Sequence, residues 1–167
     1  MNKLYLKYLS LFPVYILIQV LILNEILFFS YINPFLYILL IISLPLKTPK
    51  WFLLLYAFLL GFIIDLFSGT LGFHSTASVL IAFIKPITSK ITIPHNILGD
   101  INEITLKKIG LKSYLMFSLL LILIHNACLF ILEHVDFNIY IFGKIIASSF
   151  ITLIIIIINQ LFIKNNT

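Results

Sequence analysis

The chain has 167 residues, a formal net charge of +5, 62% hydrophobic residues and only 10% charged residues. Charged residues make up about 25% of a typical soluble domain, so this composition excludes a soluble globular protein. A membrane-spanning helix needs about 20 apolar residues, and we therefore predict one integral membrane domain over residues 1–167. The single cysteine, Cys128, excludes an intrachain disulfide and argues against a cysteine-rich metal site.

Six apolar runs follow one another along the chain, at residues 8–23, 34–46, 51–67, 72–84, 114–132 and 139–163. They predict an all-α, polytopic membrane protein with about six transmembrane helices. No small-residue cleavage site follows the first run, so we expect it to stay in the protein as a span. The second and fourth runs are short, and a re-entrant segment is the alternative for each of them.

The lysines predict how these helices are oriented. All but one lie before the first run, between the second and third, between the fourth and fifth, or after the sixth: Lys3, Lys7, Lys47, Lys50, Lys85, Lys90, Lys107, Lys108, Lys112 and Lys164. The other loops contain Glu25, Glu133 and Asp136 and no lysine. Because cytoplasmic loops are enriched in lysine and arginine, both termini are predicted to lie in the cytoplasm.

Lys144, a few residues into the last run, is the exception to this pattern. We expect it to reach the outer headgroups or to pair with an acidic residue. The net positive charge therefore indicates membrane orientation and contact with the anionic lipids of the bilayer. Nucleic-acid binding is not predicted, because the lysines are spread over several loops and arginine is absent from the sequence.

The predicted cytoplasmic loop at residues 87–113 alternates polar and apolar side chains. Ile97, Ile101 and Ile104 would fall on one face of a helix. This spacing predicts an amphipathic element that lies on the inner membrane surface. An irregular, solvated loop is the alternative.

Small side chains and one carboxylate recur every four residues in the third run: Ala57, Gly61, Asp65 and Gly69. A face with matching small and polar side chains follows in the fourth run: Ser75, Ser78 and Ala82. Small residues at this spacing let membrane helices approach closely. We therefore expect the helices of the third and fourth runs to pack face to face.

Asp65 is predicted to lie near the outer end of the third span, where an ionised carboxylate costs less than at the bilayer centre. Hydrogen bonds from Ser68, Thr70 or the backbone amides of residues 69–72 would satisfy it. The glycines in this stretch permit the positive φ angles of a sharp turn. We expect Asp65 to clamp the turn between two helices, and a proton or ion relay and a partner-binding contact are the alternatives.

Two histidines, His74 and His125, lie in apolar sequence, and Asn126 follows the second of them. We expect them to be buried and hydrogen-bonded, because no pair of metal ligands has the i, i+4 spacing typical of metalloproteases. The sequence contains no G-x-S-x-G elbow, no P-loop and no H-E-x-x-H motif. It therefore offers no support for an enzyme, a metal or a cofactor.

The stretch that begins at Gly61 resembles the signature of the MreD family of bacterial rod-shape-determining membrane proteins. The residues that carry this resemblance are Gly61, Asp65, Gly69, Gly72, His74, Lys85 and Pro86, with a second group at His125, Asn126 and Glu133. The family also has a short six-span layout and a Leu-Pro pair after the second span, matched here by Leu44 and Pro45. One branch of the family often has a histidine where Asn126 stands and an arginine where Lys85 stands.

The resemblance implies a non-enzymatic scaffold of the bacterial cell-elongation complex in the cytoplasmic membrane. Its implied partners are an MreC-like protein and, within the complex, the RodA glycosyltransferase and its transpeptidase, and its role is to support lateral peptidoglycan synthesis. The family is also reported to resemble, in fold, the substrate-binding subunits of energy-coupling-factor transporters, which implies a rival function in small-molecule binding. Residues expected to line such a cavity are Tyr15, Gln19, Asn24, Tyr56, His125 and Asn126.

Overall fold

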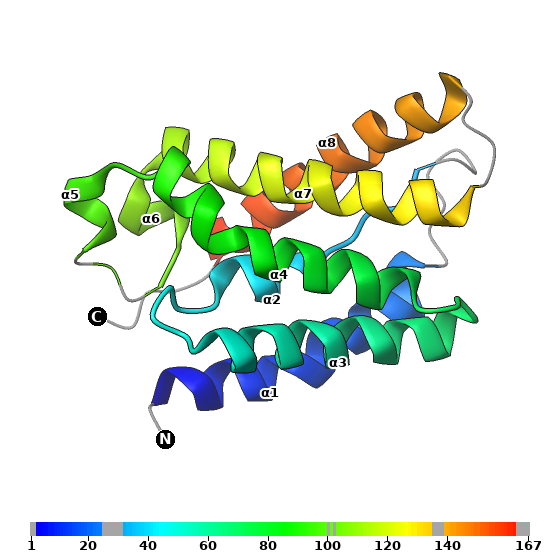
Figure 1. Cartoon of the computed structure of the whole chain (residues 1–167), viewed down its shortest axis with the longest axis horizontal. Coiled ribbons are helices and arrows are strands. Elements are labelled where there is room, and N and C mark those ends of the chain that lie inside the picture. Colours follow the sequence, from blue (N-terminus) through cyan, green and yellow to red (C-terminus); the bar gives the residue numbers. More distant parts are fainter. Residues whose placement is uncertain (1–2, 25–31, 100, 102, 135–138, 163–167) are drawn as a thin grey trace.

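A computed structural model of the chain describes residues 3–24, 32–99, 101, 103–134 and 139–162. These residues form helices and connecting segments, with no β-strand among them, which confirms the all-α prediction. The elements, in chain order, are α1 (Lys3–Ile18), the π-helix η1 (Gln19–Leu23), α2 (Ile38–Ser43), α3 (Lys50–Ser68), α4 (Phe73–Thr92), α5 (His95–Leu98), α6 (Leu106–Ile109), α7 (Leu111–Glu133) and α8 (Ile139–Phe162) (Figure 1).

Four stretches of helix in the described residues are long and apolar enough to cross a membrane: Tyr5–Leu23 in α1 and η1, and the whole of α3, α7 and α8. They confirm a membrane protein. The predicted spans at residues 34–46 and 72–84 are not among the four. The first contains only the six residues of α2, about 9 Å of helix. Helix α4 has 20 residues, but its lysines, serines and threonines make it more polar than the other four.

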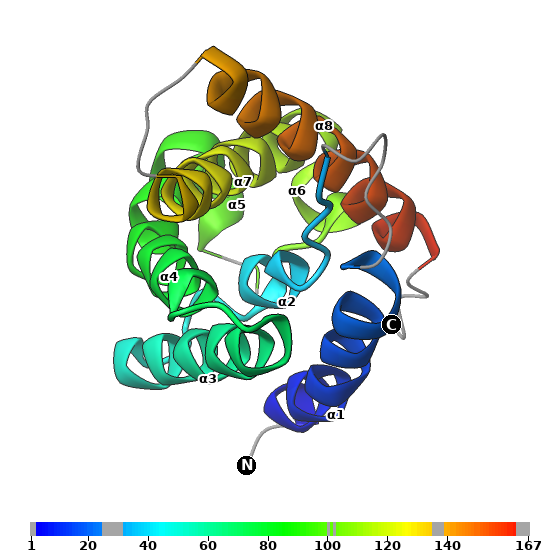
Figure 2. The same ribbon diagram turned by 90° about the vertical axis from the view of Figure 1, so that its right-hand side faces the viewer.

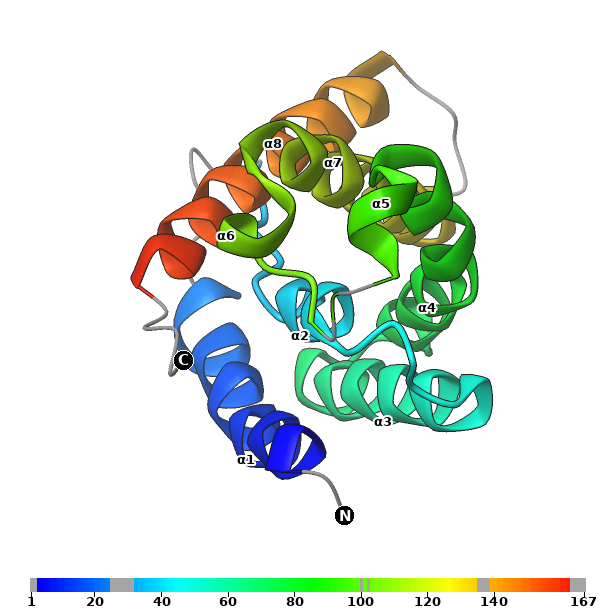
Figure 3. The same ribbon diagram turned by 90° about the vertical axis from the view of Figure 1, so that its left-hand side faces the viewer.

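Helix α2 lies inside the protein. Helix α3 packs against α4, α4 against α7, and α7 against α8, while α1 contacts both α2 and α3. Views from the two ends of the molecule show α1, α3, α4, α7 and α8 arranged around α2 (Figures 2 and 3). All six residues of α2 are buried. The apolar runs of this sequence therefore have two causes. The run around α2 is apolar because it is buried inside the protein, whereas four other runs form helices long enough to cross a membrane.

The molecule has two ends that carry different elements. The turn end holds the α3–α4 turn at residues 69–72, and the loop end holds α5, α6, the start of α1 and the end of α8 (Figure 1). The buried segment around α2 runs between these ends: the Phe35 ring lies 5.7 Å from the His74 ring, and the Leu44 carbonyl binds Lys85. Lys85 lies about 16 Å beyond His74 along α4.

The loop between α4 and α7 folds onto the protein. Helices α5 and α6 have four residues each, so one amphipathic helix along residues 87–113 does not form. Ile101 and Ile104 lie between α5 and α6 and join the hydrophobic core. Their apolar surface is therefore covered by the protein itself, which removes the reason for the predicted contact with the membrane surface.

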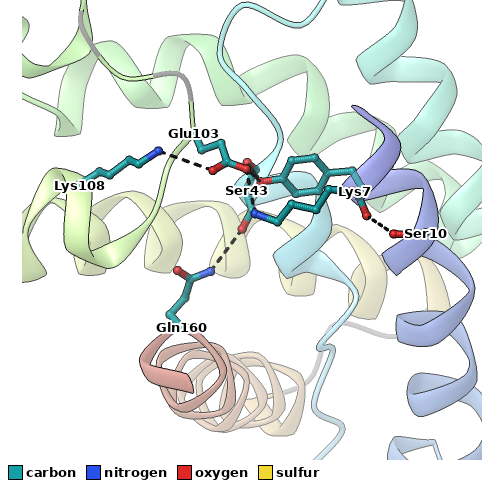
Figure 4. A network of polar contacts seen from close by, with 7 residues as sticks. Lys7, Ser10, Ser43, Glu103, Lys108 and Gln160 are labelled. Carbon is teal, nitrogen blue, oxygen red and sulfur yellow. Dashed lines mark hydrogen bonds and ion pairs between the residues drawn. The ribbon is translucent and has the colours of Figure 1, made fainter. Parts of the chain in front are cut away.

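Glu103 ties this loop to the start of α1. Its carboxylate lies 3.0 Å from the Lys7 ammonium and 3.6 Å from that of Lys108, and the Tyr8 hydroxyl is 3.0 Å away (Figure 4). Burial alone raises the pKa of Glu103, but hydrogen bonds from Lys7 and Tyr8, with the positive charges of Lys7 and Lys108, outweigh it and lower the pKa. Close by, the Gln160 amide donates to the Ser43 hydroxyl at 3.5 Å, which joins α8 to α2.

Candidate functional site

The Asp65 carboxylate caps the first turn of α4 from the neighbouring helix α3. One oxygen accepts hydrogen bonds from the His74 amide at 3.0 Å and the Thr70 hydroxyl at 2.5 Å. The other accepts from the Ser75 amide at 2.9 Å and the Ser75 hydroxyl at 2.5 Å. The first amides of a helix have no partner within it, and its N-terminus favours negative charge. Asp65 is 3% exposed, so these bonds replace its hydration.

The predicted hydrogen bond from Thr70 to Asp65 is thus present, but the backbone donors differ from the prediction. They come from the first turn of α4 rather than from residues 69–72. Ser68 does not bind Asp65 in the described contacts; its hydroxyl accepts a hydrogen bond from the Asn24 amide at 2.9 Å. Asp65 therefore binds the backbone of the helix that follows the turn rather than the backbone of the turn itself.

Glycines bring α3 and α4 close enough for this cap. A Cβ at Gly61 would lie 2.5 Å from the His74 carbonyl oxygen and 2.6 Å from the Ser75 Cα, so the two backbones touch at this point. Gly69 and Gly72, which flank the turn, have φ angles of 66° and 87°. L-residues with a Cβ rarely adopt such angles. The predicted close approach of the two helices is confirmed.

His74 and His125 share one hydroxyl group. The Tyr37 hydroxyl lies 3.0 Å from His74 Nδ1 and 2.6 Å from His125 Nε2. On the far side, His125 Nδ1 lies 3.1 Å from Asn126 Oδ1, and Asn126 Nδ2 donates to the Ser149 hydroxyl at 2.9 Å. The chain of contacts links α4, the residue before α2, α7 and α8.

The direction of this chain follows from its one acceptor-only atom. Asn126 Oδ1 cannot donate, so Nδ1 of His125 carries the hydrogen and Nε2 accepts from Tyr37. The single hydroxyl hydrogen of Tyr37 is then used, and His74 Nδ1 must donate to its oxygen. His125 is neutral in this arrangement, because one ring nitrogen donates and the other accepts, and the chain reaches Ser149 only through the Asn126 amide, which does not pass a proton on. The geometry favours buried, hydrogen-bonded histidines over a proton relay.

Lys85 occupies the interior, although its charge led us to place it in a cytoplasmic loop. It is 1% exposed, and its ammonium donates to the Ile41 carbonyl at 2.9 Å and the Leu44 carbonyl at 2.5 Å. The last carbonyls of a helix lack partners within it, and a positive charge is favourable there. Lys85 of α4 therefore caps the C-terminus of α2. Pro86 follows it within α4.

Glu133, at the end of α7, belongs to the turn end. Its Oε2 atom lies 3.5 Å from the Lys144 ammonium and 3.7 Å from Nδ1 of His134. Of the two alternatives predicted for Lys144, contact with the outer headgroups or a pair with an acidic residue, the structure shows the pair. The Lys144 ammonium also lies 4.5 Å from the centre of the Phe130 ring, within the range of a cation–π contact.

Glu133 also lines an open cavity of about 500 Å³ at the turn end. The other lining residues are Val20, Leu21, Asn24, Asn33, Phe35, Phe67, Ser68, Thr70, Phe73, His74 and Leu129. Of the six residues predicted to line a cavity, only Asn24 is among them. Gln19 instead holds backbone in place: its amide donates to the Pro34 carbonyl at 2.9 Å, and its Oε1 accepts from the Leu36 amide at 2.9 Å.

The remaining predicted cavity residues bind other parts of the protein. The Tyr15 hydroxyl donates to Asn159 at 2.8 Å, and the Tyr56 hydroxyl donates to the Tyr8 carbonyl at 3.0 Å. His125 and Asn126 lie in the Tyr37 network. Tyr37 was missed by the sequence interpretation; its only signal was a hydroxyl inside an apolar run.

Thr152 was missed as well, and it serves the non-helical backbone before α2. Its hydroxyl accepts from the Phe35 amide at 3.0 Å, and the Ser148 hydroxyl accepts from the Asn33 amide at 3.2 Å. Backbone that is not helical is tolerated at membrane depth only where the protein satisfies it. Polar residues of η1 and α8, namely Gln19, Ser148 and Thr152, satisfy this backbone.

Within the part of the chain that the structure describes, no group of three or more His, Cys, Asp or Glu side chains is placed to hold a metal ion. The chain matches no protein-family model, no curated protein and no solved structure. Membership of the MreD family therefore stays a prediction.

Proposed function

We propose that this protein is a non-enzymatic scaffold of the cell-elongation complex in the bacterial cytoplasmic membrane. It would bind an MreC-like partner and, through the complex, support lateral peptidoglycan synthesis by RodA and its transpeptidase. The proposal rests on the contacts that the residues of the MreD-like signature make in the structure. Gly61 allows two backbones to touch, and Asp65 and Lys85 each cap a neighbouring helix. Side chains that make such contacts stabilise the fold, which supports a structural role for the protein rather than a catalytic one.

The proposal includes six membrane crossings with both termini in the cytoplasm. Four helices meet the length and hydropathy expected of spans, and α4 with the buried segment around α2 would supply the two return passages. The start of α1 and the end of α8 lie at the same end of the molecule, in keeping with an even number of crossings (Figure 1). Lys47, between α2 and α3, and Lys90, near the end of α4, are both exposed.

Cysteine labelling tests this orientation. In a Cys128→Ser background, Leu71→Cys at the turn end and Lys47→Cys before α3 place single thiols at exposed positions. A membrane-impermeant maleimide added to intact spheroplasts is expected to label the first and not the second. The reverse pattern would overturn the proposed orientation.

The scaffold role is tested by depletion and by recovery of partners. Depletion in a rod-shaped bacterium that carries this chain is expected to produce rounded cells, and expression of the wild-type chain to restore rods. The full-length tagged protein, solubilised in mild detergent, is expected to co-purify with an MreC-like protein. Rod shape that persists after depletion, together with no MreC-like partner in the purified material, would refute the proposal.

A second candidate function is favoured by the cavity at the turn end. A small-molecule-binding subunit of a transporter needs a cavity of this order, since ligand sites commonly measure about 300 to 1,000 Å³. The cavity of about 500 Å³ falls in that range. Uptake of a small molecule that stops on depletion, while the cells keep their rod shape, would favour this function over the scaffold.

A further inference from the structure

The cavity at the turn end combines apolar walls with polar atoms that accept hydrogen bonds. Phenylalanine side chains line it, among them Phe35, which is buried, and Phe67, which is exposed. Apolar and aromatic walls with a few polar groups are typical of small-molecule sites. The walls alone would fit many ligands, so the polar groups decide the class.

Three of these polar groups are acceptors. The Oδ1 atom of Asn33 is buried and, within the described residues, has no hydrogen-bond partner. The Tyr37 network makes Nδ1 of His74 a donor, and in a neutral imidazole ring Nε2 is then an acceptor. The third is the carboxylate of Glu133, whose contacts with Lys144 and His134 both use Oε2 and leave Oε1 as an acceptor.

The charge of the residues that line the cavity also favours a ligand that donates hydrogen bonds. Among the described residues that line the cavity, Glu133 is the only Asp, Glu, Lys or Arg. Lys144 pairs with Glu133 but does not line the cavity. A ligand that donates hydrogen bonds and carries a positive charge would suit a lining of this kind.

We propose that this cavity binds a ligand that joins an apolar, ring-sized body to a primary ammonium group. The ring would pack against the phenylalanine walls, and the ammonium would face Glu133. The inference does not rest on the scaffold role. It gives a ligand class to the second candidate function and stands or falls separately from assembly with an MreC-like protein.

Tryptamine is a suitable probe, because it carries an indole ring and a primary ammonium. The full-length protein in detergent is expected to unfold at a higher temperature as tryptamine is added, with a saturable dependence on concentration. Indole-3-propionate, which has the same ring and a carboxylate, is expected to give no saturable shift. No saturable shift with tryptamine, or an equal one with indole-3-propionate, would overturn the proposal.

Matched carboxylate variants test the site itself. Glu133→Gln is expected to weaken tryptamine binding by about fivefold, the effect of one partly exposed ion pair. Glu103→Gln removes a carboxylate that is also paired with two lysines, but at the loop end, and is expected to leave the affinity unchanged. Equal affinity in the wild type and the Glu133→Gln variant would refute the site.

The ammonium has two natural sources, a free amine and a lipid headgroup, and the bilayer distinguishes them. Nanodiscs of phosphatidylcholine offer no primary ammonium, whereas those of phosphatidylethanolamine do. Weaker tryptamine binding in phosphatidylethanolamine would assign the site to that headgroup, and equal binding in the two lipids would assign it to a free amine.

Discussion

The cap that Asp65 places on α4 predicts a graded loss of stability on substitution. Asp65→Leu leaves the amides of His74 and Ser75 without their acceptors, while the hydroxyls of Thr70 and Ser75 are free to turn to other partners. An unsatisfied buried donor costs about 1–3 kcal/mol, so two amides predict a loss of about 2–6 kcal/mol. Asp65→Asn keeps one acceptor oxygen and turns an NH₂ group toward the other amide. It should lose about 1–3 kcal/mol.

Equilibrium unfolding of the purified protein in detergent, followed by circular dichroism, measures both losses. Glu133→Gln is the control, because its carboxylate is 40% exposed and paired at the surface, where such pairs contribute at most about 1 kcal/mol. Asp65→Leu with wild-type stability would refute the cap. A folded Asp65→Asn protein that is as unstable as Asp65→Leu would show that the charge at the helix N-terminus matters more than the number of hydrogen bonds.

Three further substitutions test other contacts of the fold. Gly61→Ala is expected to cost about 1–3 kcal/mol because its Cβ would overlap backbone, whereas Gly99→Ala, with nothing within 4 Å, should be neutral in the same unfolding assay. Lys85→Met should speed deuterium exchange in α2, and Lys90→Met, which alters an exposed lysine of the same helix, should not. Because the folded-state pKa of Glu103 is lowered, its stabilisation is present above the ordinary value of about 4.3 and is lost as pH falls through the lower value. Exchange in α6 should therefore rise below about pH 4 in the wild type more than in Glu103→Gln.

The contact between α3 and α4 could be predicted from the sequence because it depends on spacing alone. Residues four apart lie on one face of a helix, so Gly61 and Asp65 had to face the same neighbour. The atoms that bind Asp65 could not be predicted in the same way. They depend on where α4 begins after the turn and in which direction its first amides point, which is set by the backbone angles at Gly69 and Gly72.

The segment around α2 shows where hydropathy is ambiguous. Residues 38–43 are apolar and buried, but the protein rather than lipid surrounds them, since α2 packs against α1, α4 and α7. Hydropathy measures the preference of a side chain for leaving water and does not distinguish these two environments. The side chains that accept hydrogen bonds from the backbone of this segment, such as those of Gln19 and Thr152, are not adjacent to it in the sequence. No local pattern therefore predicts them.

Lys85 shows the same limit for charge. Counting lysines predicts which side of the membrane a loop faces, but the count includes a lysine that binds backbone carbonyls in the interior. Asp65 and Lys85 both bind backbone groups that lack partners at a helix end. Their charges are opposite because a carboxylate is favourable at a helix N-terminus and an ammonium at a C-terminus. Each binds backbone rather than the other, and along α4 Lys85 lies about 16 Å from His74, whose amide binds Asp65. Sites more than about 10 Å apart without shared partners contribute additively, so a double variant of Asp65→Leu and Lys85→Met should lose the sum of the single losses to within about 0.5 kcal/mol. A larger coupling in a double-mutant cycle would mean that α2, α3 and α4 move as one switch, and that the two charges sense each other through α4.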